Sequence, residues 1–315
     1  RAKETKVIDF LGKKKIFFIL SAVVIIAGFV TMGVHKGNGG DALNYSLEFK
    51  GGTSTNVEFN EDMSIEELDE KVVPIIEEIS KDANVQTQKV QGSNQVIFKS
   101  ATLDVSQREE LNSRLEEEFG VDPEKITAET ISSTISSEMR TGAVSAVVVS
   151  TVLMLLYVWF RFKDVRFGAS SVAALVHDVL VVLAFYAAAR VSVGNTFIAC
   201  MLTIVGYSIN ATIVIFDRIR ENMTSYKTKE ELAAIVNRSI SQTLSRSIFT
   251  SLTTFIMVAV LYILGVSSIK EFALPLMVGI ACGTYSSICL ASAFWYLLRT
   301  RVGGKKAEKN KKAAK

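Results

Sequence analysis

Cysteine and histidine are scarce in this chain of 315 residues, which contains three cysteines and two histidines. All three cysteines, Cys200, Cys282 and Cys289, lie within long apolar segments, and the polar insert of residues 35–140 has none. The insert therefore shows neither a disulfide framework nor a metal-binding pattern. Its one histidine, His35, lies at the edge of an apolar segment, so the insert also lacks a set of nucleophile, base and orienting group. We predict that the protein is not an enzyme and needs no cofactor.

Polar faces are missing from six apolar segments, each close to the ~20 residues that a helix needs to cross a bilayer. A core helix of a soluble protein would show a polar face, whereas the segment "AVSAVVVSTVLMLLYVWF" shows none. A signal peptide is the alternative for the first segment, but its apolar stretch is too long and no small-x-small cleavage site follows. We therefore predict one transmembrane helix before the insert and five within residues 141–298. Their apolar segments are residues 16–34, 143–160, 168–189, 196–216, 248–265 and 272–298.

Basic residues gather in the segments that alternate spans would leave on one side of a membrane: residues 1–15, 161–168, 217–246 and 299–315. Lys and Arg resist translocation, so these segments and both termini are expected on the cytoplasmic side of a bacterial inner membrane. Residues 35–140 are then expected outside, and there acidic residues outnumber basic ones by more than two to one. The net charge of +3 is thus a sum of two opposite populations and gives no indication of a nucleic-acid partner. The basic tail is expected to anchor the chain at anionic membrane lipid, with a contact to a ribosome or translocase as the alternative.

The insert shows alternating strand and helix patterns. Ser64 and Glu67 form a capping-box pattern before apolar residues at helical spacing, which predicts a helix that Pro74 kinks. A second helical pattern ends at Gly120. Extended segments precede the first helix, flank a short connection at residues 91–93 and follow the second helix. The order strand, helix, strand, strand, helix, strand predicts an α+β ferredoxin-like domain inserted after the first transmembrane helix.

The stretch before the first helix of the insert, "HKGNGGDALNYSLEFKGGTSTNVEFN", is expected to be extended. It contains Gly51 and Gly52, which we interpret as a structural turn, because glycine permits a tight backbone reversal where Phe49 packs. A hinge is the alternative. The acidic residues of the insert are expected to form a solvated surface, with a recognition patch for a moving partner as the alternative.

Ionisable side chains within apolar segments are costly and therefore indicate function. The third segment contains His177 and Asp178 in "ALVHDVLVVL", and neither is expected to face lipid without a partner or a water-filled crevice. Two interpretations stay open. The residues are either a proton-conducting or gating pair, or a polar clamp near the cytoplasmic end of the helix that Arg161 or Arg166 caps.

The fourth apolar segment has small or polar residues at every second position: Gly206, Ser208, Asn210 and Thr212. This pattern predicts close helix contact and a polar seam between helices. The segment ends in "FDRIREN", where Asp217, Arg218, Arg220 and Glu221 can pair at helical spacing, as in an ordinary charged membrane exit.

The fifth apolar segment is preceded by Arg246, and hydroxyl side chains crowd its first turns: Ser247, Thr250, Ser251, Thr253 and Thr254. Hydroxyl groups at this spacing line one helix face and can hold water beside a cation. The alternative is that Arg246 extends to the inner membrane interface.

Four motifs occur in order along the chain: "LEFKGGT" after the first apolar segment, "HDV" in the third, "GYSINATIVIFDRIREN" in the fourth and "QTLSRSIFTSLTT" in the fifth. Together they resemble SecF, a subunit family of the bacterial Sec protein-export machinery, or the SecF half of fused SecDF, over essentially the whole chain. The resemblance implies the resistance-nodulation-division superfamily fold and a SecD partner, either separate or fused. It also implies association with the SecYEG channel and use of the proton-motive force to draw preproteins out after the ATPase SecA has driven them in.

Many SecF sequences have an Asp after the Asn of the fourth-segment motif, and that carboxylate belongs to their proton pathway together with an Arg of the next span. Here the motif reads "SINAT", with Ala211 at the Asp position, while the Arg matches Arg246. The resemblance thus implies a proton-coupling seam whose acid SecD supplies. Its expected members in this chain are Asn210, Ala211, Thr212, Arg246 and Thr250.

The leading hypothesis is an energy-coupling subunit of the Sec translocase. One alternative is a passive scaffold that docks the Sec channel or a chaperone without proton movement, which the missing carboxylate favours. Another is a half-transporter of the same superfamily for lipids or drugs, which predicts an acid in the fourth segment that this chain lacks.

Overall fold

The computed structural model describes residues 7–38, 40–83, 85–90, 93–162, 164–223 and 228–300. They form two compact units. The helical unit is built from residues up to 44, residues 146–192 and the chain from residue 196 onward. The insert unit is built from residues 45–145 with residues 193–195.

Six helices of the described residues are long and apolar enough to cross a membrane. Their faces expose large apolar side chains such as Phe160 and Leu264, as helices do where they face lipid. The predicted fold class, with six transmembrane helices, is confirmed. The helices are α1 (Lys14–Gly37), α6 (Ser133–Phe162), α7 (Val165–Ala189), α8 (Asn195–Asn222), α9 (Lys229–Leu264) and a last helix, Ile269–Thr300, that contains most of α10 (Ser267–Tyr285) and all of η2 (Ser286–Ala291).

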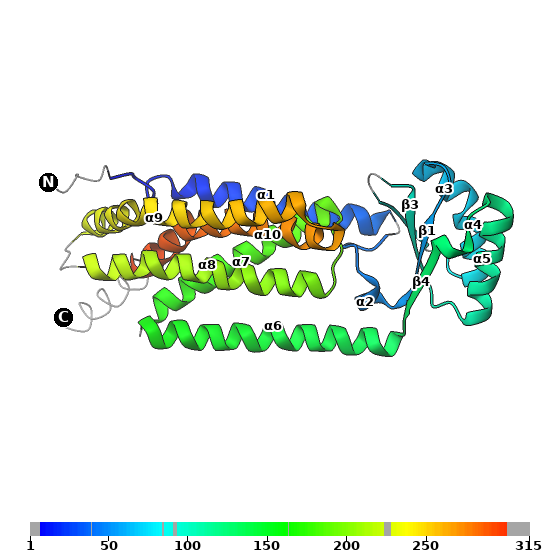
Figure 1. Ribbon diagram of the computed structural model, residues 1–315. Coiled ribbons are helices and arrows are strands. Elements are labelled where there is room, and N and C mark those ends of the chain that lie inside the picture. The colour runs from blue at the N-terminus through cyan, green and yellow to red at the C-terminus, as the bar shows by residue number, and fades with distance from the viewer. Residues whose placement is uncertain are drawn as a thin grey trace. The chain divides into compact units, whose positions relative to one another are not determined.

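The helices of the helical unit pack through small residues and aromatic rings. α10 contacts both α7 and α9, and α1 packs against α7 (Figure 1). Gly28 of α1 permits this approach, because a Cβ atom there would overlap with Ala184 of α7. The ring of Phe167 packs against Phe216 and stacks on Trp295, each with 4.9 Å between centroids. These rings tie α7, α8 and the last helix together.

The last helix changes its geometry partway along. η2 (Ser286–Ala291) is π-helical and largely buried. Such wider turns are rare and occur frequently at functional sites. Here the segment begins with Ser286 and Ser287, whose hydroxyl groups bond to α7 and α8 respectively.

The insert unit is a four-stranded antiparallel sheet in the order β2-β3-β1-β4, with helices beside it (Figure 1). The order of elements along the chain is the one predicted, and the ferredoxin-like domain is confirmed. Residues 91 and 92 of the predicted β2–β3 connection lie outside the described residues. The elements are β1 (Gly52–Glu58), α3 (Ile65–Lys71), α4 (Val73–Ser80), β2 (Gln86–Lys89), β3 (Gln95–Ser100), α5 (Val105–Phe119), η1 (Pro123–Lys125) and β4 (Ile126–Ile131).

The core of the insert unit lies between the sheet and its helices. Val57 of β1 is paired with Val96 of β3, and both side chains are buried together with that of Phe98. Leu111 and Leu115 of α5 pack into the same core. Alternation along the strands and helical spacing along α5 thus produce one shared apolar layer.

Capping boxes begin two helices of the insert. The predicted box at Ser64 is confirmed, since the Ser64 side chain accepts the backbone N–H of Glu67 and the Glu67 carboxylate accepts the N–H of Ser64. Asp104 and Gln107 form a second box at α5. Donation from these backbone N–H groups holds the pKa of Glu67 and of Asp104 below their ordinary values. α5 ends as predicted at Gly120, which has a left-handed φ of 63°.

The segment before β1 differs from the extended prediction. Residues Leu47–Lys50 form a helical turn, α2, so that prediction is wrong there. The turn buries Phe49 and ends at Gly51, and Gly51 and Gly52 have φ values of 76° and 116°. Burial of the aromatic ring and a reversal that glycine tolerates favour this turn over an extended chain. The positive φ values agree with the structural-turn interpretation.

Pro74 breaks the predicted helix instead of kinking it. α3 ends at Lys71, and Pro74 stands in the first turn of the separate helix α4. Proline has no backbone N–H to continue the bonding of α3, but it fits the first turn of a helix, where that donor is not needed.

The segment before α1 is held against α9. Asn237 Oδ1 accepts the backbone N–H groups of Phe10 and Leu11 at 3.1 Å each, and Asn237 Nδ2 donates to Asp9 at 2.8 Å. The backbone N–H of Gly12 also donates to Asp9, at 2.8 Å. The Gly12 and Asn237 donors hold the pKa of the Asp9 carboxyl below 3.8, its ordinary value.

Leu115→Ala is expected to destabilise the insert unit by roughly 2–5 kcal/mol, because it leaves a cavity at a fully buried position. The matched control Ile65→Ala truncates a side chain that is 47% exposed and is expected to cost about 0.5 kcal/mol or less. Amide hydrogen exchange of β1 and β3 in the full-length protein measures both changes. Equal loss of protection in the two variants would contradict the assigned core.

Asn237→Ala is expected to release residues 9–12 from α9, because one side chain bonds Asp9, Phe10 and Leu11. A lowered Asp9 pKa means that the carboxylate's contribution is present above its ordinary value of 3.8 and is lost as the pH falls through the still lower folded value. Docking should therefore persist from about pH 7 to about pH 5. Hydrogen exchange of this segment, corrected for intrinsic rates, tests both statements. If the segment before α1 is released above about pH 5 and Asp9→Asn abolishes that release, the direction assigned to the Asp9 pKa shift is wrong.

Candidate functional site

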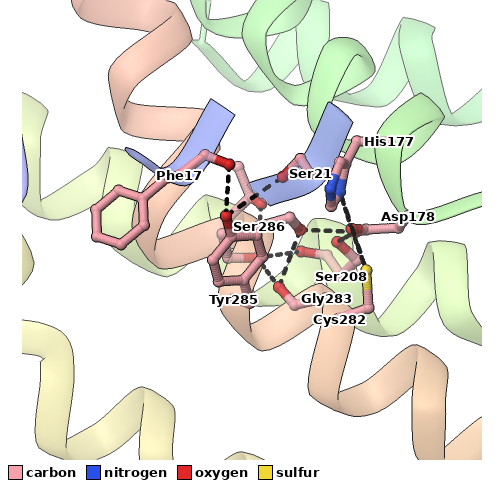
Figure 2. A network of polar contacts seen from close by, with 11 residues as sticks. Phe17, Ser21, His177, Asp178, Ser208, Cys282, Gly283, Tyr285 and Ser286 are labelled. Carbon is pink, nitrogen blue, oxygen red and sulfur yellow. Dashed lines mark hydrogen bonds and ion pairs between the residues drawn. The ribbon is translucent and has the colours of Figure 1, made fainter. Parts of the chain in front are cut away.

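A buried carboxylate, Asp178 of α7, lies at the centre of a polar network within the helical unit (Figure 2). Its Oδ2 atom accepts hydrogen bonds from Ser208 Oγ of α8 at 2.5 Å and from Ser286 Oγ of η2 at 2.8 Å. Its Oδ1 atom lies 3.0 Å from His177 Nδ1 and accepts a hydrogen bond from Cys282 Sγ of α10 at 3.3 Å. We call these five residues the Asp178 cluster.

The Asp178 cluster accommodates a group that the membrane would otherwise exclude. Asp178, Ser208 and Ser286 are all fully buried. A carboxylate without partners at such a position would carry a large desolvation cost, and donors from three helices remove much of it. The same bonds hold α7, α8 and the last helix together at this depth.

Three members of the cluster have the atom types of a metal site. His177, Asp178 and Cys282 offer nitrogen, oxygen and sulfur atoms within 4.8 Å of one another. In the structure, however, these atoms bond directly to each other through the His177–Asp178 and Cys282–Asp178 contacts. We therefore describe the arrangement as a hydrogen-bond network.

The second ring nitrogen of His177 lies away from Asp178. This Nε2 atom is buried and has no hydrogen-bond partner among the described residues. The ring lines a mainly apolar cavity of about 480 Å³ whose walls come from α1, α7, α9 and α10. Tyr285 also lines it, and its hydroxyl group donates to the Phe17 carbonyl oxygen at 2.8 Å and lies 3.3 Å from Ser21 Oγ (Figure 2).

Glycines bring α10 close to α8 beside the Asp178 cluster. A Cβ atom at Gly279 would overlap with Ile204, and one at Gly283 would lie 3.1 Å from Ser208 Cβ. Glycines four residues apart are typical of close helix packing in membranes. This approach lets Ser208 and Ser286 reach the same carboxylate oxygen.

A second polar site, which we call the Arg246 cavity, lies where α8 meets α9. It has a volume of about 100 Å³, and Arg246, Asn210 and Thr250 are exposed beside it on the surface of the helical unit. Ala211 contributes only a methyl group. The complete lining is Tyr207, Asn210, Ala211, Val214, Arg246, Ser247, Thr250 and Ser251.

The predicted seam residues thus fall into two places. Asn210, Ala211, Arg246 and Thr250 line the Arg246 cavity together. Thr212 is buried elsewhere and lies 3.0 Å from the hydroxyl group of Ser287 in η2. Residues two apart on a helix face different sides, which separates Thr212 from Asn210.

Hydroxyl groups connect the Arg246 cavity to the last helix. Tyr207 of α8 donates to Ser251 Oγ at 2.7 Å, and Thr284 of α10 donates to the same atom at 2.6 Å. Tyr207 is followed directly by Ser208, and Thr284 lies two residues before Ser286. The Arg246 cavity and the Asp178 cluster therefore share α8, and Ser251 of the cavity lining also bonds to the last helix.

This arrangement of spanning helices and one inserted α+β unit is shared with known proteins. Residues 111–301 match the family described as protein export membrane protein SecD/SecF, C-terminal. The chain belongs to the SecD/SecF family. The protein translocase subunit SecF of Sebaldella termitidis is 36% identical over 307 residues, which are 97% of this chain and 96% of that protein. The subunit SecDF of Bacillus subtilis is 34% identical over 298 residues, which are 93% of this chain and 38% of that protein.

Solved SecDF structures share the fold. The crystal structure of SecDF from Thermus thermophilus, a translocon-associated membrane protein, matches with a TM-score of 0.77 and 35% identity, over 94% of this chain and 39% of that one. SecDF in a super-membrane-facing form matches with a TM-score of 0.64 at 35% identity, over 96% of this chain and 40% of that one. The resemblance found in the sequence is confirmed, and this SecD/SecF family member is a multi-pass membrane protein with a role in protein export.

Asp217 and Arg218, two of the charged residues expected to pair at the end of α8, lie outside both polar sites. Asp217 pairs with Arg161 of α6 at 2.7 Å, whereas Arg218 pairs with Glu221 at 2.5 Å. Only the second pair is the expected neighbour at helical spacing. Arg161 engages Asp217, and the contacts described for Asp178 come from hydroxyl, thiol and imidazole groups rather than from Arg161 or Arg166.

Cys282, Ser286 and the π-helical turn are functional candidates that sequence reasoning missed. Single hydroxyl or thiol residues in an apolar segment form no pattern of their own. The available signal was the spacing of Gly279 and Gly283 in "GIACG", which marks the face of the sixth span that meets another helix.

Gly279→Ala is expected to destabilise the helical unit by roughly 1–3 kcal/mol, because the new methyl group would push Ile204 and α8 away. Gly206→Ala is the matched control, since a Cβ atom there meets nothing within 4 Å. It should be neutral or slightly stabilising in a helix. Thermal unfolding in detergent measures both variants. If the control loses as much stability as Gly279→Ala, the loss does not come from the close contact between α8 and α10.

Proposed function

We propose that this chain is a SecF-type subunit that acts with SecD to couple the proton-motive force to late steps of protein export. The observation that carries the proposal is the polar surface of the Arg246 cavity. Arg246, Asn210 and Thr250 are exposed on helices that cross the membrane. Support also comes from the fused SecDF relative of Bacillus subtilis, in which a SecF-like region occupies 38% of the chain.

The depth of the Arg246 cavity makes this surface significant. Asn210 lies about 9 Å inside the Phe216 end of the fourth apolar segment, given a rise of about 1.5 Å per residue. Arg246 lines the same cavity, so it lies beside this part of α8 although it precedes the fifth apolar segment in sequence. A guanidinium group and an amide at this depth cannot face lipid at low cost. A partner that covers them with polar groups of its own would remove that cost.

The proposed partner supplies the acid that this chain lacks at position 211. The cavity holds a fixed positive charge, a tyrosine hydroxyl group and several serine and threonine hydroxyl groups, but its lining contains no carboxylate. Arg246 would favour the ionised form of a carboxylate placed beside it. Proton uptake by that carboxylate would weaken its pairing with Arg246 and release α9 from the partner helix. The chemistry thus links protonation to a change of helix packing.

The proposal includes a topology and a set of partners. Residues 1–15 and 299–315 would lie in the cytoplasm and residues 35–140 outside, because Lys and Arg resist translocation. Within the tail, residues 301–315 lie outside the described part of the chain. The partners are SecD, the SecYEG channel with SecA in the same pathway, the preprotein and membrane lipid.

Arg246→Met is expected to abolish the uncoupler-sensitive part of preprotein release, because it removes the charge that pairs with the partner's acid. Arg246→Lys keeps a positive charge and is expected to retain part of that release. Ala211→Asp should leave coupling in place or raise it. The measurement is release of a secreted protein from cells depleted of this chain and resupplied with each variant, with and without an uncoupler.

Membrane insertion of each variant is the control for this experiment. Release that is insensitive to the uncoupler in every variant, including the unsubstituted chain, would support the passive-scaffold alternative and reject proton coupling. Normal coupling in Arg246→Met would reject the role of Arg246 alone.

A further inference from the structure

One carboxylate occurs within the six apolar segments of this chain, and it is Asp178. The proposed function places no proton on it, since the Arg246 cavity lies on another side of α8 and depends on an acid from a partner. Asp178 is nevertheless fully buried within a membrane-spanning helix. Ionisable residues at such positions are costly to keep and default to a role in ion or proton movement.

The surroundings of Asp178 suit a group that gains and loses a proton. The contacts described for its carboxylate come from Ser208, Ser286, Cys282 and His177. None of these four carries a permanent positive charge. A hydroxyl group can donate to a carboxylate and can equally accept from a carboxylic acid, so the two serines can serve both states.

His177 offers a route for the proton. Its Nδ1 atom lies 3.0 Å from Asp178 Oδ1, and we assign the ring proton to Nδ1 because an ionised carboxylate can only accept. Nε2 is then an acceptor, and it is buried with no partner among the described residues, in a histidine that lines the mainly apolar cavity. A proton that arrives at Nε2 turns the ring into an imidazolium whose Nδ1–H already points at the carboxylate.

We propose that Asp178 is a proton-binding site within this chain and that His177 carries the proton to it. In the loading step Nε2 gains a proton and Nδ1 transfers its own to Asp178 Oδ1. The result is a neutral carboxylic acid and a neutral imidazole with its hydrogen on Nε2. The reverse step returns the proton by the same two atoms. The pair gains one proton in total, and the only bonds that change are those of hydrogen to Nε2, Nδ1 and Oδ1.

Proton binding at Asp178 would be transmitted through Ser286 and Ser208. Both hydroxyl groups donate to Oδ2 of the carboxylate. A neutral acid is a weaker acceptor than a carboxylate, so these two charge-assisted bonds weaken on protonation. Ser286 is the first residue of η2, where the helix already departs from α-helical bonding. The π-helical segment is therefore the element whose bonding can change with the proton.

The other titratable groups around the pair are few. Besides Cys282, the ring of Tyr285 lies 6.0 Å from that of His177, and its hydroxyl group bonds to α1. On α8 the facing group is Ser208, which does not titrate in this range. Arg246 belongs to the separate cavity. A pH dependence of this site is therefore assigned to Asp178 and His177 as a pair.

Infrared spectroscopy tests the site without any export assay. The full-length protein in lipid vesicles is titrated, and the carboxylic-acid C=O band of a buried group is followed as the pH falls. Asp178→Asn is expected to remove this band. Ser286→Ala keeps the carboxyl group but removes one donor, so its band should persist at a shifted frequency and appear at higher pH.

Three results would overturn the proposal. One is a pH-difference spectrum that Asp178→Asn leaves unchanged. Another is a band in the unsubstituted protein that does not vary with pH. The third is loss of the band at constant pH when K⁺ is replaced by Na⁺, which would make a metal cation the ligand. Should Asp178→Asn fail to fold, Asp178→Glu must shift the band, and an unshifted band would also reject the assignment.

The part that this site plays in export rests on the proposed function. In the release assay Asp178→Asn is expected to lose the uncoupler-sensitive part. A titrating infrared band together with release that the uncoupler does not change would support the proton site and reject the proposed function. An absent band together with uncoupler-sensitive release would reject the proton site and support the proposed function.

Discussion

The burial of one carboxylate governs how the membrane helices of this protein meet. Asp178 can stay in α7 only if other helices bring donors to it, and Ser208, Ser286 and Cys282 do so from α8, η2 and α10. That requirement explains the close approach at Gly279 and Gly283, because larger side chains there would hold α8 and α10 apart. It also gives a reason for the π-helical turn, which begins at the serine that reaches the carboxylate.

α8 also carries a second polar site of opposite character, which it shares with α9. The Asp178 carboxylate is buried and receives its hydrogen bonds from within the chain, whereas the Arg246 cavity is small, polar and exposed at its edge. A buried site keeps a charged group away from lipid, and an exposed polar site can contact another subunit. In the proposed function the partner meets the exposed site, and in the further inference the buried site responds to a proton of its own. α8 and the last helix are the elements through which one could affect the other.

Much of the fold follows from local pattern, and much of the site does not. Six apolar segments of bilayer length, the capping box at Ser64 and the glycine stop at Gly120 each specify an element without help from distant residues. The helical turn Leu47–Lys50 was not predicted, because a single turn depends on the burial of Phe49. That burial is set by tertiary packing and is not visible in the local sequence. The importance of His177 and Asp178 was visible because ionisable residues are rare in lipid, but their partners were not. Ser286 and Cys282 lie more than 100 positions away in sequence, and only packing shows that they meet Asp178.

Tyr207 and Ser208 occupy consecutive positions on α8, and each serves a different polar site. A rotation of α8 about its axis that improves the geometry of one bond must therefore change the geometry of the other. Substitutions on the two sides of this helix should not act independently, even though the side chains never touch. In engineered variants and in related proteins, we expect the residue that is tolerated at position 207 to depend on the residue at position 208. It should also depend on Gly279 and Gly283 of α10. The sequence of α8 is constrained as a unit, and changes within it are expected to be accepted in sets rather than one at a time.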